Sequence, residues 1–199
     1  MKSHSSVITT VAAAMLSTAA VSAAAVRTGG IYLTAADYTE HRLSFEGDCK
    51  SSSHKLDLHD VLHKTYIHVT HGTETKRYEK SDLFGFRSCK GVDYRLAGNR
   101  EYQILEANAL YVYQTLRQVS QTKDMRTVPE YHFSVGPTGA VMLLTINNLK
   151  RALPDNHKFH DSLDQMVGTG QDLAQFEDFH KMFKVNRLWI ASTSTDRQE

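Results

Sequence analysis

The chain has little of three residues that often dominate small exported proteins or linkers. It holds two cysteines, three prolines and one tryptophan in 199 residues. So few prolines, together with only 11 glycines, argue against long disordered linkers. Apolar residues make up 41% and charged residues 23%, as in an ordinary globular domain. The length therefore predicts one domain, with at most a small appendage.

Acidic residues are missing from the start of the chain, where none occurs before Asp37. Lys2 gives the first few residues a positive charge, and a weakly apolar, alanine-rich run follows from Val7 to Val21. Small residues after this run permit cleavage after Ala23 or Ala25. This run is shorter than the roughly 20 residues that a membrane-spanning helix needs. Residues 1–25 are therefore predicted to be a cleaved signal peptide, which leaves an exported chain with no stable membrane span.

Charge of one sign is not in excess. Once Lys2 is removed with the signal peptide, 22 Lys and Arg side chains balance 22 Asp and Glu side chains, and no basic run is longer than two residues. Nucleic acid is therefore not an expected partner, and binding to an anionic membrane surface is equally unsupported.

The two cysteines are Cys49 and Cys89. In an oxidising compartment such an isolated pair is most simply a disulfide. In the chain-entropy model, closing a loop of about 40 residues stabilises the fold by roughly 4 kcal/mol. The alternative is two separate thiols, because a sequence does not supply the Cα distance on which a disulfide depends.

The run from Tyr78 to Arg95 is the most densely patterned part of the chain and predicts a β-hairpin that reverses at Gly91. A two-residue turn at Lys90-Gly91 would require positive φ at a lysine. A type I turn over residues 88–90, followed by a left-handed Gly91, requires only a glycine in the difficult conformation. The second turn is therefore favoured.

That turn fixes the register of the hairpin. It places Arg87 opposite Asp93 and Phe86 opposite Tyr94, so that an ion pair and an aromatic pair each face across the strands. It also places Cys89 in the loop, where another part of the chain can reach it.

The first two thirds of the mature chain have a strand-like pattern. From Lys55 to Tyr113 apolar residues recur with a period of two, which predicts an antiparallel meander with one apolar face. Residues 120–129 are polar and predict a loop, and Gly136 to Gly139 predict the turn of a second hairpin.

Helical patterns occur once near the start and again near the end. Thr34, followed by Asp37, predicts a short helical turn from Ala35 to about His41. Thr145 and Asn156 are suited to cap two further helices, the first over residues 146–153. A third helix is predicted from about Gln171 to Asn186, with an apolar stripe of Leu173, Phe176, Phe179 and Phe183.

These patterns predict an α+β fold. An antiparallel sheet, either open or closed into a barrel-like shape, is followed by two or three helices that pack on its apolar face. The expected division is a single domain over residues 26–191, mainly β over 26–144 and helical over 145–187, with a disordered tail at 192–199.

Several stretches resemble a group of exported proteins from Gram-negative bacteria. They are LTINNLKRALPDNHKFHDSLDQM and DLAQFEDFHKMFKVNRL within residues 143–188, preceded by GIYLTAADY, SDLFGFRSCKGVDYR and YHFS. Members of the group are mostly described as hypothetical or of unknown function. The resemblance implies export, to the periplasm or out of the cell, and an α+β layout. It supplies no catalytic residues.

Histidine is the residue in excess, with five between positions 54 and 71. Neutral imidazole is a common zinc ligand. However, His59 and His63 share a face only in a helix, whereas their surroundings have a strand pattern. His68 alternates with apolar neighbours and is expected to point to solvent, and His71 is expected in a turn. No metal site is therefore predicted, and these four histidines are the only candidate ligands.

Other catalytic and cofactor motifs are also missing. The sequence has no GxSxG and no phosphate-binding glycine loop, and Glu177-x-x-His180 lacks the second such element that a di-iron bundle needs. Paired carboxylates of a glycosidase follow no local spacing rule. No catalytic residue and no cofactor are predicted.

Two functions remain as hypotheses. The first is a non-catalytic binding or structural module for a protein or glycan ligand. The crowded tyrosines of the meander would bind such a ligand if they form an exposed patch; the alternative is that they are core residues. The alternative is a small metal-dependent or carboxylate hydrolase that uses the histidine-rich segment 54–71. Metal content distinguishes them.

Overall fold

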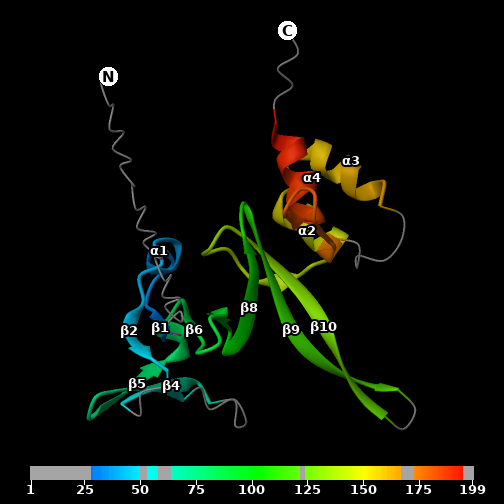
Figure 1. The fold of residues 1–199 in the computed structure, drawn as a ribbon. Coiled ribbons are helices and arrows are strands. Elements are labelled where there is room, and N and C mark those ends of the chain that lie inside the picture. Colours follow the sequence, from blue (N-terminus) through cyan, green and yellow to red (C-terminus); the bar gives the residue numbers. More distant parts are fainter. Residues whose placement is uncertain (1–27, 50–52, 58–63, 122–123, 167–172, 195–199) are drawn as a thin grey trace, which may run out of the picture.

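The computed structural model describes residues 28–49, 53–57, 64–121, 124–166 and 173–194. The predicted signal peptide lies outside these ranges. The described chain is mostly antiparallel sheet with a few helices, which confirms the α+β class. Figure 1 shows helices α2 to α4 grouped at one end of the molecule over β9 and β10, with the small sheet of β4 and β5 at the other end.

The main sheet has eight antiparallel strands in the order β11-β10-β9-β8-β7-β6-β1-β2. Their bounds are β1 Thr28–Tyr32, β2 Ser44–Asp48, β6 Gly85–Arg87, β7 Asp93–Ala97, β8 Arg100–Ala107, β9 Leu110–Gln121, β10 Asp124–Val135 and β11 Met142–Leu143. Strands β11 and β2 are the two opposite edges of this sheet, so the sheet is open. Of the two shapes that the sequence allowed, an open sheet or a barrel-like one, the described strands form the first.

The strands do not form the single meander that the sequence predicted. The segment between β2 and β6 makes a separate three-stranded sheet of β3 (His54–Asp57), β4 (Tyr66–His71) and β5 (Glu74–Glu79). A short 3-10 helix, η2 (Lys80–Asp82), leads from β5 back to the main sheet. Strand β1 pairs with β6, so the small sheet is an insertion between β2 and β6 of the main sheet. It packs on the main sheet. Ile67, Val69, Phe86 and Leu96 are buried between the two sheets.

The predicted hairpin is confirmed in detail. Gly91 has a φ of 76°, and its N–H donates to the Ser88 carbonyl, as in the type I turn followed by a left-handed glycine. Strands β6 and β7 pair Arg87 with Asp93 and Phe86 with Tyr94. The two rings of the aromatic pair are stacked, with centroids 4.9 Å apart.

The capping predictions are also confirmed. Helix α1 (Ala35–Thr39) begins with a capping box between Thr34 and Asp37. Thr145 caps α2 (Ile146–Ala152), and Asn156 caps α3 (His157–Asp164), each by accepting a hydrogen bond from a backbone N–H of the first turn.

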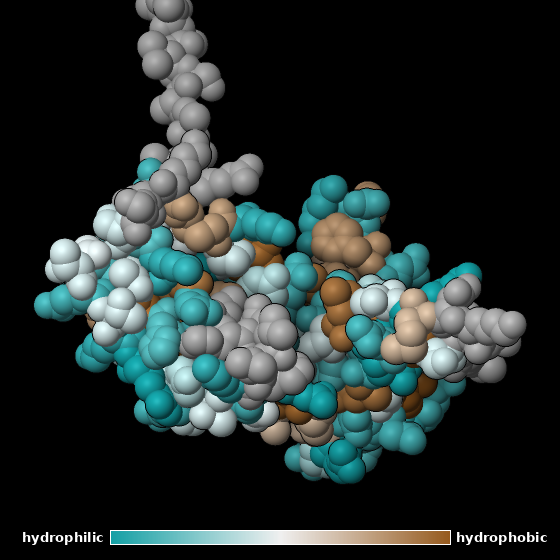
Figure 2. All heavy atoms as spheres, turned by 90° about the horizontal axis from the view of Figure 1, so that it is seen from below, coloured by the Kyte–Doolittle hydropathy of each residue, from teal (hydrophilic) through white to brown (hydrophobic). Residues whose placement is uncertain are grey.

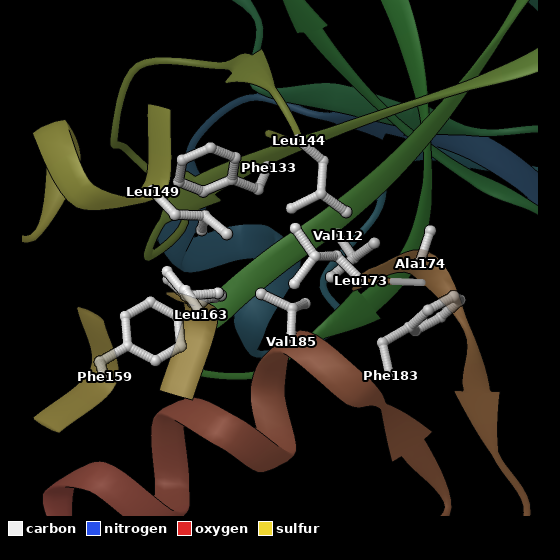
Figure 3. Packing of buried hydrophobic residues seen from close by; sticks show 11 residues of the cluster. Val112, Phe133, Leu144, Leu149, Phe159, Leu163, Leu173, Ala174, Phe183 and Val185 are labelled. Atoms are coloured by element: carbon white, nitrogen blue, oxygen red, sulfur yellow. The ribbon is translucent and has the colours of Figure 1, made fainter. Parts of the chain in front are cut away.

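The larger core lies between the helices and one face of β9 and β10. Figure 3 shows its side chains converging from the sheet and from all three C-terminal helices or their flanks. The fully buried members are Leu110, Val112, Phe133, Leu149, Phe159, Leu163, Leu173 and Val185. Asn186, also fully buried, donates to the Leu110 carbonyl and accepts from the Leu110 N–H, which fixes α4 (Lys184–Thr193) to the start of β9.

The loop predicted at residues 120–129 is wrong. Strand β9 continues to Gln121 and β10 begins at Asp124, with Pro129 inside β10. A proline is tolerated there because β11 pairs only with His132 and Phe133, so β10 is an edge strand at Pro129.

The helix predicted from Gln171 to Asn186 is also wrong. A short hairpin of β12 (Phe176–Glu177) and β13 (Met182–Phe183) takes its place, and α4 follows it. The apolar stripe does not pack as one face, since Phe179 is 92% exposed. Helix α4 also runs past the predicted end of the domain into the expected tail, of which residues 195–199 lie outside the described ranges.

One face of the described chain is mostly hydrophilic (Figure 2). Figure 2 shows one face on which polar residues dominate and apolar residues form small, separate patches. Nor does any helix in the described ranges have the length and apolar character needed to cross a membrane.

Candidate functional site

A disulfide fixes the tip of the β6–β7 hairpin. Cys49, just after β2, is bonded to Cys89 in the turn, with their Cα atoms 5.5 Å apart. The predicted pairing is therefore confirmed. Because the turn is tied to the edge of the main sheet, the residues that follow it, Gly91 to Asp93, are held in a defined position beside β8.

Asp93 is the charged group that this arrangement positions. Arg87 donates from Nε to Oδ1 and from Nη2 to Oδ2, both at 2.7 Å, and the Tyr32 hydroxyl donates to Oδ1 at 3.0 Å. The Asp93 side chain is 17% exposed. Its carboxylate is thus held by three hydrogen bonds in a fixed direction at the start of β7.

Two phenols near Asp93 are held in their protonated form. Burial, followed by the charge of Asp93, raises the pKa of Tyr32 far above its usual value, and the same two causes raise the pKa of Tyr38. Burial also raises the pKa of Tyr111. At neutral pH these side chains are hydrogen-bond donors and cannot act as bases.

A cleft of about 360 Å³ opens beside Asp93. Its walls are Tyr38 from α1, the turn residues Gly91 and Val92, and residues 103–107 of β8. Strand β8 has a bulge between Ile104 and Glu106, which changes the direction of the strand at this wall.

A second carboxylate, Glu106, also lines the cleft. Its Oε2 accepts from the Phe183 backbone N–H at 2.8 Å, and its Oε1 accepts from the Asn108 side-chain amide. Both carboxylates of the cleft are therefore already engaged by donors of the protein. The Gln103 amide on the same wall makes no hydrogen bond within the described part of the chain.

Behind the cleft lies a cluster of buried aromatic residues. Its members are Tyr32, Tyr38, Phe84, Tyr102, Tyr111 and Tyr113. The sequence did not decide whether the tyrosines of the predicted meander are core residues or an exposed patch. Three of them, Tyr102, Tyr111 and Tyr113, belong to this cluster and are core residues. They form a rigid wall, and Tyr38 is the member that reaches the cleft.

One buried cation supports this wall. Arg95, 8% exposed, donates to the Tyr113 hydroxyl at 2.8 Å, to Ser134 Oγ at 2.9 Å and to the Gly139 carbonyl at 2.8 Å. These three acceptors are neutral oxygens. Because these oxygens come from β9, β10 and the loop after β10, Arg95 joins the strands that carry the aromatic cluster.

The candidate metal ligands do not form a site within the described residues. His59 and His63 lie outside them. His68 and His71 are three residues apart in β4, so their side chains leave opposite faces of the small sheet. No group of three His, Cys, Asp or Glu side chains in the described ranges is placed to hold a metal ion.

Two other histidines of the described ranges are buried, and neither was among the four candidate ligands. His54 is 6% exposed and packs against Gly47, where an added Cβ would lie 2.3 Å from the imidazole ring. His132 is also 6% exposed and meets the ring of Tyr102 edge-on at 5.0 Å. Burial lowers the pKa of both imidazoles, so they are neutral at pH 7.

A second hollow, of about 580 Å³, lies at the helical end. It is lined by the connection between α2 and α3 and by Trp189 and Ser192 of α4. The Asn156 amide at its edge donates to the Ser192 hydroxyl. Its lining combines apolar side chains with Asp155, His157 and Lys158.

Sequence reasoning found only part of the cleft. The hairpin register predicted the contact between Arg87 and Asp93, but nothing predicted Tyr32, Tyr38 or Glu106. These residues come from β1, α1 and β8, and no local spacing joins them. Comparisons with protein-family models, with curated proteins and with solved structures found no match for the chain.

Proposed function

We propose that this chain is an exported, non-catalytic binding module that takes a hydroxyl-rich ligand, such as a glycan, in the cleft beside Asp93. The observation that carries the proposal is the Asp93 carboxylate, which Arg87 and Tyr32 hold in place at the wall of the cleft. A fixed charged acceptor at a concave surface is suited to orient a ligand.

The state of the polar groups favours binding over catalysis. A general base or nucleophile needs a pKa near the working pH or a free, activated atom. Here Asp93 and Glu106 each accept hydrogen bonds on both oxygens, and the pKa of Tyr38 is far too high for proton abstraction. These groups accept and donate hydrogen bonds without being prepared to transfer a proton.

The lining favours a hydroxyl-rich ligand. A sugar hydroxyl both donates and accepts, so it is recognised by carboxylates, amides and backbone groups acting together. The cleft supplies two carboxylates and the Gln103 amide beside the ring of Tyr38. Its volume lies at the lower end of the range of about 300–1,000 Å³ that small-molecule sites occupy.

Export is part of the proposal. The disulfide between Cys49 and Cys89 is a bond that persists in oxidising compartments and is rare in the cytosol. The N-terminal pattern of residues 1–25 and the resemblance to exported Gram-negative proteins remain predictions that agree with it. Analysis of the N-terminus of protein recovered from the periplasm or the medium tests this point.

A glycan microarray, followed by calorimetric titration, tests the binding function. Gln103 and Gln114 face each other across β8 and β9, but only Gln103 lines the cleft, so they form a matched pair. Gln103→Ala is expected to weaken binding of the best glycan at least about tenfold, as for the loss of a buried hydrogen bond. Gln114→Ala is expected to leave it unchanged.

Two results contradict the proposal. The first is an array on which no carbohydrate binds. The second is a bound carbohydrate whose affinity responds equally to both glutamine substitutions, since the ligand would then lie elsewhere.

A further inference from the structure

Strands β9 and β10 extend beyond the rest of the main sheet as a two-stranded ribbon. They pair without interruption from Leu110–Val135 to Gln121–Asp124. Strand β8 pairs with β9 only as far as Gln114. Figure 1 shows the two strands continuing together past the other strands of the sheet. A two-stranded ribbon is marginally stable by itself, so its free edges matter.

The backbone groups on the free edge of β9 follow from the alternation along the strand. The Ala109 carbonyl accepts from the Gly136 N–H, so at position 109 the backbone faces β10. Successive residues of an antiparallel strand face opposite neighbours. The backbone N–H and C=O groups of Leu116, Gln118 and Ser120 therefore face away from β10. In the described part of the chain, no strand pairs with β9 there.

The free edge of β10 differs because it carries a proline. The Tyr131 carbonyl accepts from the Leu144 N–H, so at position 131 the backbone faces away from β9. Pro129, two residues earlier, faces the same way and has no N–H to donate. A proline in this position prevents a further strand from pairing. One edge of the ribbon is thus protected, and the other is not.

The ribbon also exposes apolar side chains on one of its faces. Leu116 is 69% exposed and Met125 is 66% exposed. Leu116 is opposite Pro129, and Met125 is opposite Ser120. Because directly opposite residues share a face, all four lie on the same side of the ribbon.

We propose that the free edge of β9 pairs in antiparallel fashion with the same edge of a second copy of this chain. The twofold axis passes between the two copies of Gln118, so Leu116 lies opposite the partner's Ser120. By the antiparallel pattern, about six main-chain hydrogen bonds form between the outward groups of Leu116, Gln118 and Ser120 and their counterparts. The product is a four-stranded sheet of two ribbons.

The side chains of β9 suit a second copy. Between Thr115 and Ser120 the only charged residue is Arg117, and this register places it opposite the partner's Val119. No like charges therefore meet across the axis. The same register aligns Met125, Ser120 and the partner's Leu116 in one row, so that the two exposed apolar side chains approach over a small serine.

The protected edge of β10 limits the assembly. After two copies have paired, the outer strands of the joined sheet are the two β10 strands, and each carries Pro129 on its free edge. The interface is the same patch on both subunits, so the assembly closes as a dimer and does not grow into a fibre.

Light scattering coupled to size-exclusion chromatography of the purified chain tests the proposal. Gln118 and Thr127 are directly opposite each other, both exposed, and each faces its own free edge. Gln118→Pro removes an N–H from the β9 edge, and Thr127→Pro removes one from the β10 edge. A dimer is expected for the wild type and for Thr127→Pro, and a monomer for Gln118→Pro.

A cross-link provides an independent test that does not depend on proline. In a hydrogen-bonded antiparallel pair the Cα atoms are about 5.5 Å apart, within the range of disulfides. Gln118→Cys is therefore expected to form a disulfide-linked dimer on a non-reducing gel, and Thr127→Cys is expected to remain a monomer on that gel.

Three results would overturn the proposal. They are a monomeric wild type at high micromolar concentration, a dimer that survives Gln118→Pro, and equal dissociation by both proline variants. The last would show that the prolines act by weakening the ribbon as a whole.

Discussion

Arg87 and Asp93 lie opposite each other across the β6–β7 hairpin, with both guanidinium contacts at 2.7 Å. The disulfide at Cys89 fixes the turn between them. The pair therefore serves two purposes. It closes the hairpin, and it fixes the Asp93 carboxylate at the wall of the cleft.

Removal of this arginine tests how strongly the pair is coupled to the fold. The Asp93 side chain is only 17% exposed, so Arg87→Ala leaves a largely buried charge with the Tyr32 hydroxyl as its remaining donor. Urea unfolding is expected to show a loss of about 3 kcal/mol. Arg42, whose side chain is 62% exposed in its ion pair with Asp37, is the control, and Arg42→Ala is expected to cost less than about 1 kcal/mol. Equal losses would contradict this account.

The Arg95 network predicts a cost for a small substitution. Ser134→Ala removes an acceptor of Arg95 and a partner of the Tyr113 hydroxyl, both of which are buried. Thermal or urea unfolding is expected to show a loss of about 2 kcal/mol. Ser162→Ala, which removes an exposed hydroxyl that bonds to its own helix, is the control and is expected to change stability by less than about 0.5 kcal/mol. A Ser134→Ala variant as stable as that control would show that the network contributes little.

Stability is expected to fall below neutral pH because of the buried histidines. Burial lowers the folded-state pKa of His54 and His132, so between the unfolded value near 6.5 and the lowered folded value the unfolded chain binds more protons. The free energy of unfolding therefore decreases as the pH drops below about 6.5, by up to about 1.4 kcal/mol per pH unit for each histidine. His132→Phe should reduce this slope. Identical slopes for wild type and variant would rule out His132 as a source.

Loss of the disulfide should destabilise the chain strongly. The bond joins residues 40 apart, and the double substitution Cys49→Ser/Cys89→Ser is expected to lower the free energy of unfolding by roughly 4 kcal/mol. The wild-type protein, denatured without reductant, should show no reactive thiol in a colorimetric assay. Two reactive thiols per chain would contradict the pairing.

Chelation should not affect the fold. His68 and His71 lie on opposite faces of β4 and cannot share an ion with each other. We therefore expect an unchanged melting temperature in the presence of EDTA, and less than one equivalent of zinc by elemental analysis of the purified chain. Stoichiometric zinc that is lost together with stability on chelation would favour the hydrolase alternative that uses segment 54–71.

Local rules predicted the parts of the fold that depend on neighbouring residues. Gly91 is the only residue of its turn suited to a left-handed conformation, and this fixed the hairpin register. Thr145 and Asn156 have side chains that cap a helix directly after them. In each case the deciding interaction spans four residues or fewer, so the sequence was sufficient.

Predictions failed where the partner was distant. The polar character of residues 120–129 suggested a loop. They form strand instead, and Pro129 is tolerated there because the short β11 leaves that edge of β10 unpaired. The spacing of Phe176, Phe179 and Phe183 suggested a helix, but of these three only Phe183 is buried. Phe179 is exposed because it lies in the turn of the hairpin that forms instead. The cleft was missed for the same reason, since Tyr38 and Glu106 reach it from elements 68 residues apart in sequence.

Chemical-shift mapping by NMR tests the central claim most directly. The chain is titrated with the oligosaccharide that binds most tightly on the array, and the backbone amides are followed. We expect the largest shifts at Gly91, Val92 and residues 103–107, with the indole N–H of Trp189 unchanged. Shifts centred on Trp189, or shifts below detection around Asp93, would contradict the assignment of the cleft as the binding site.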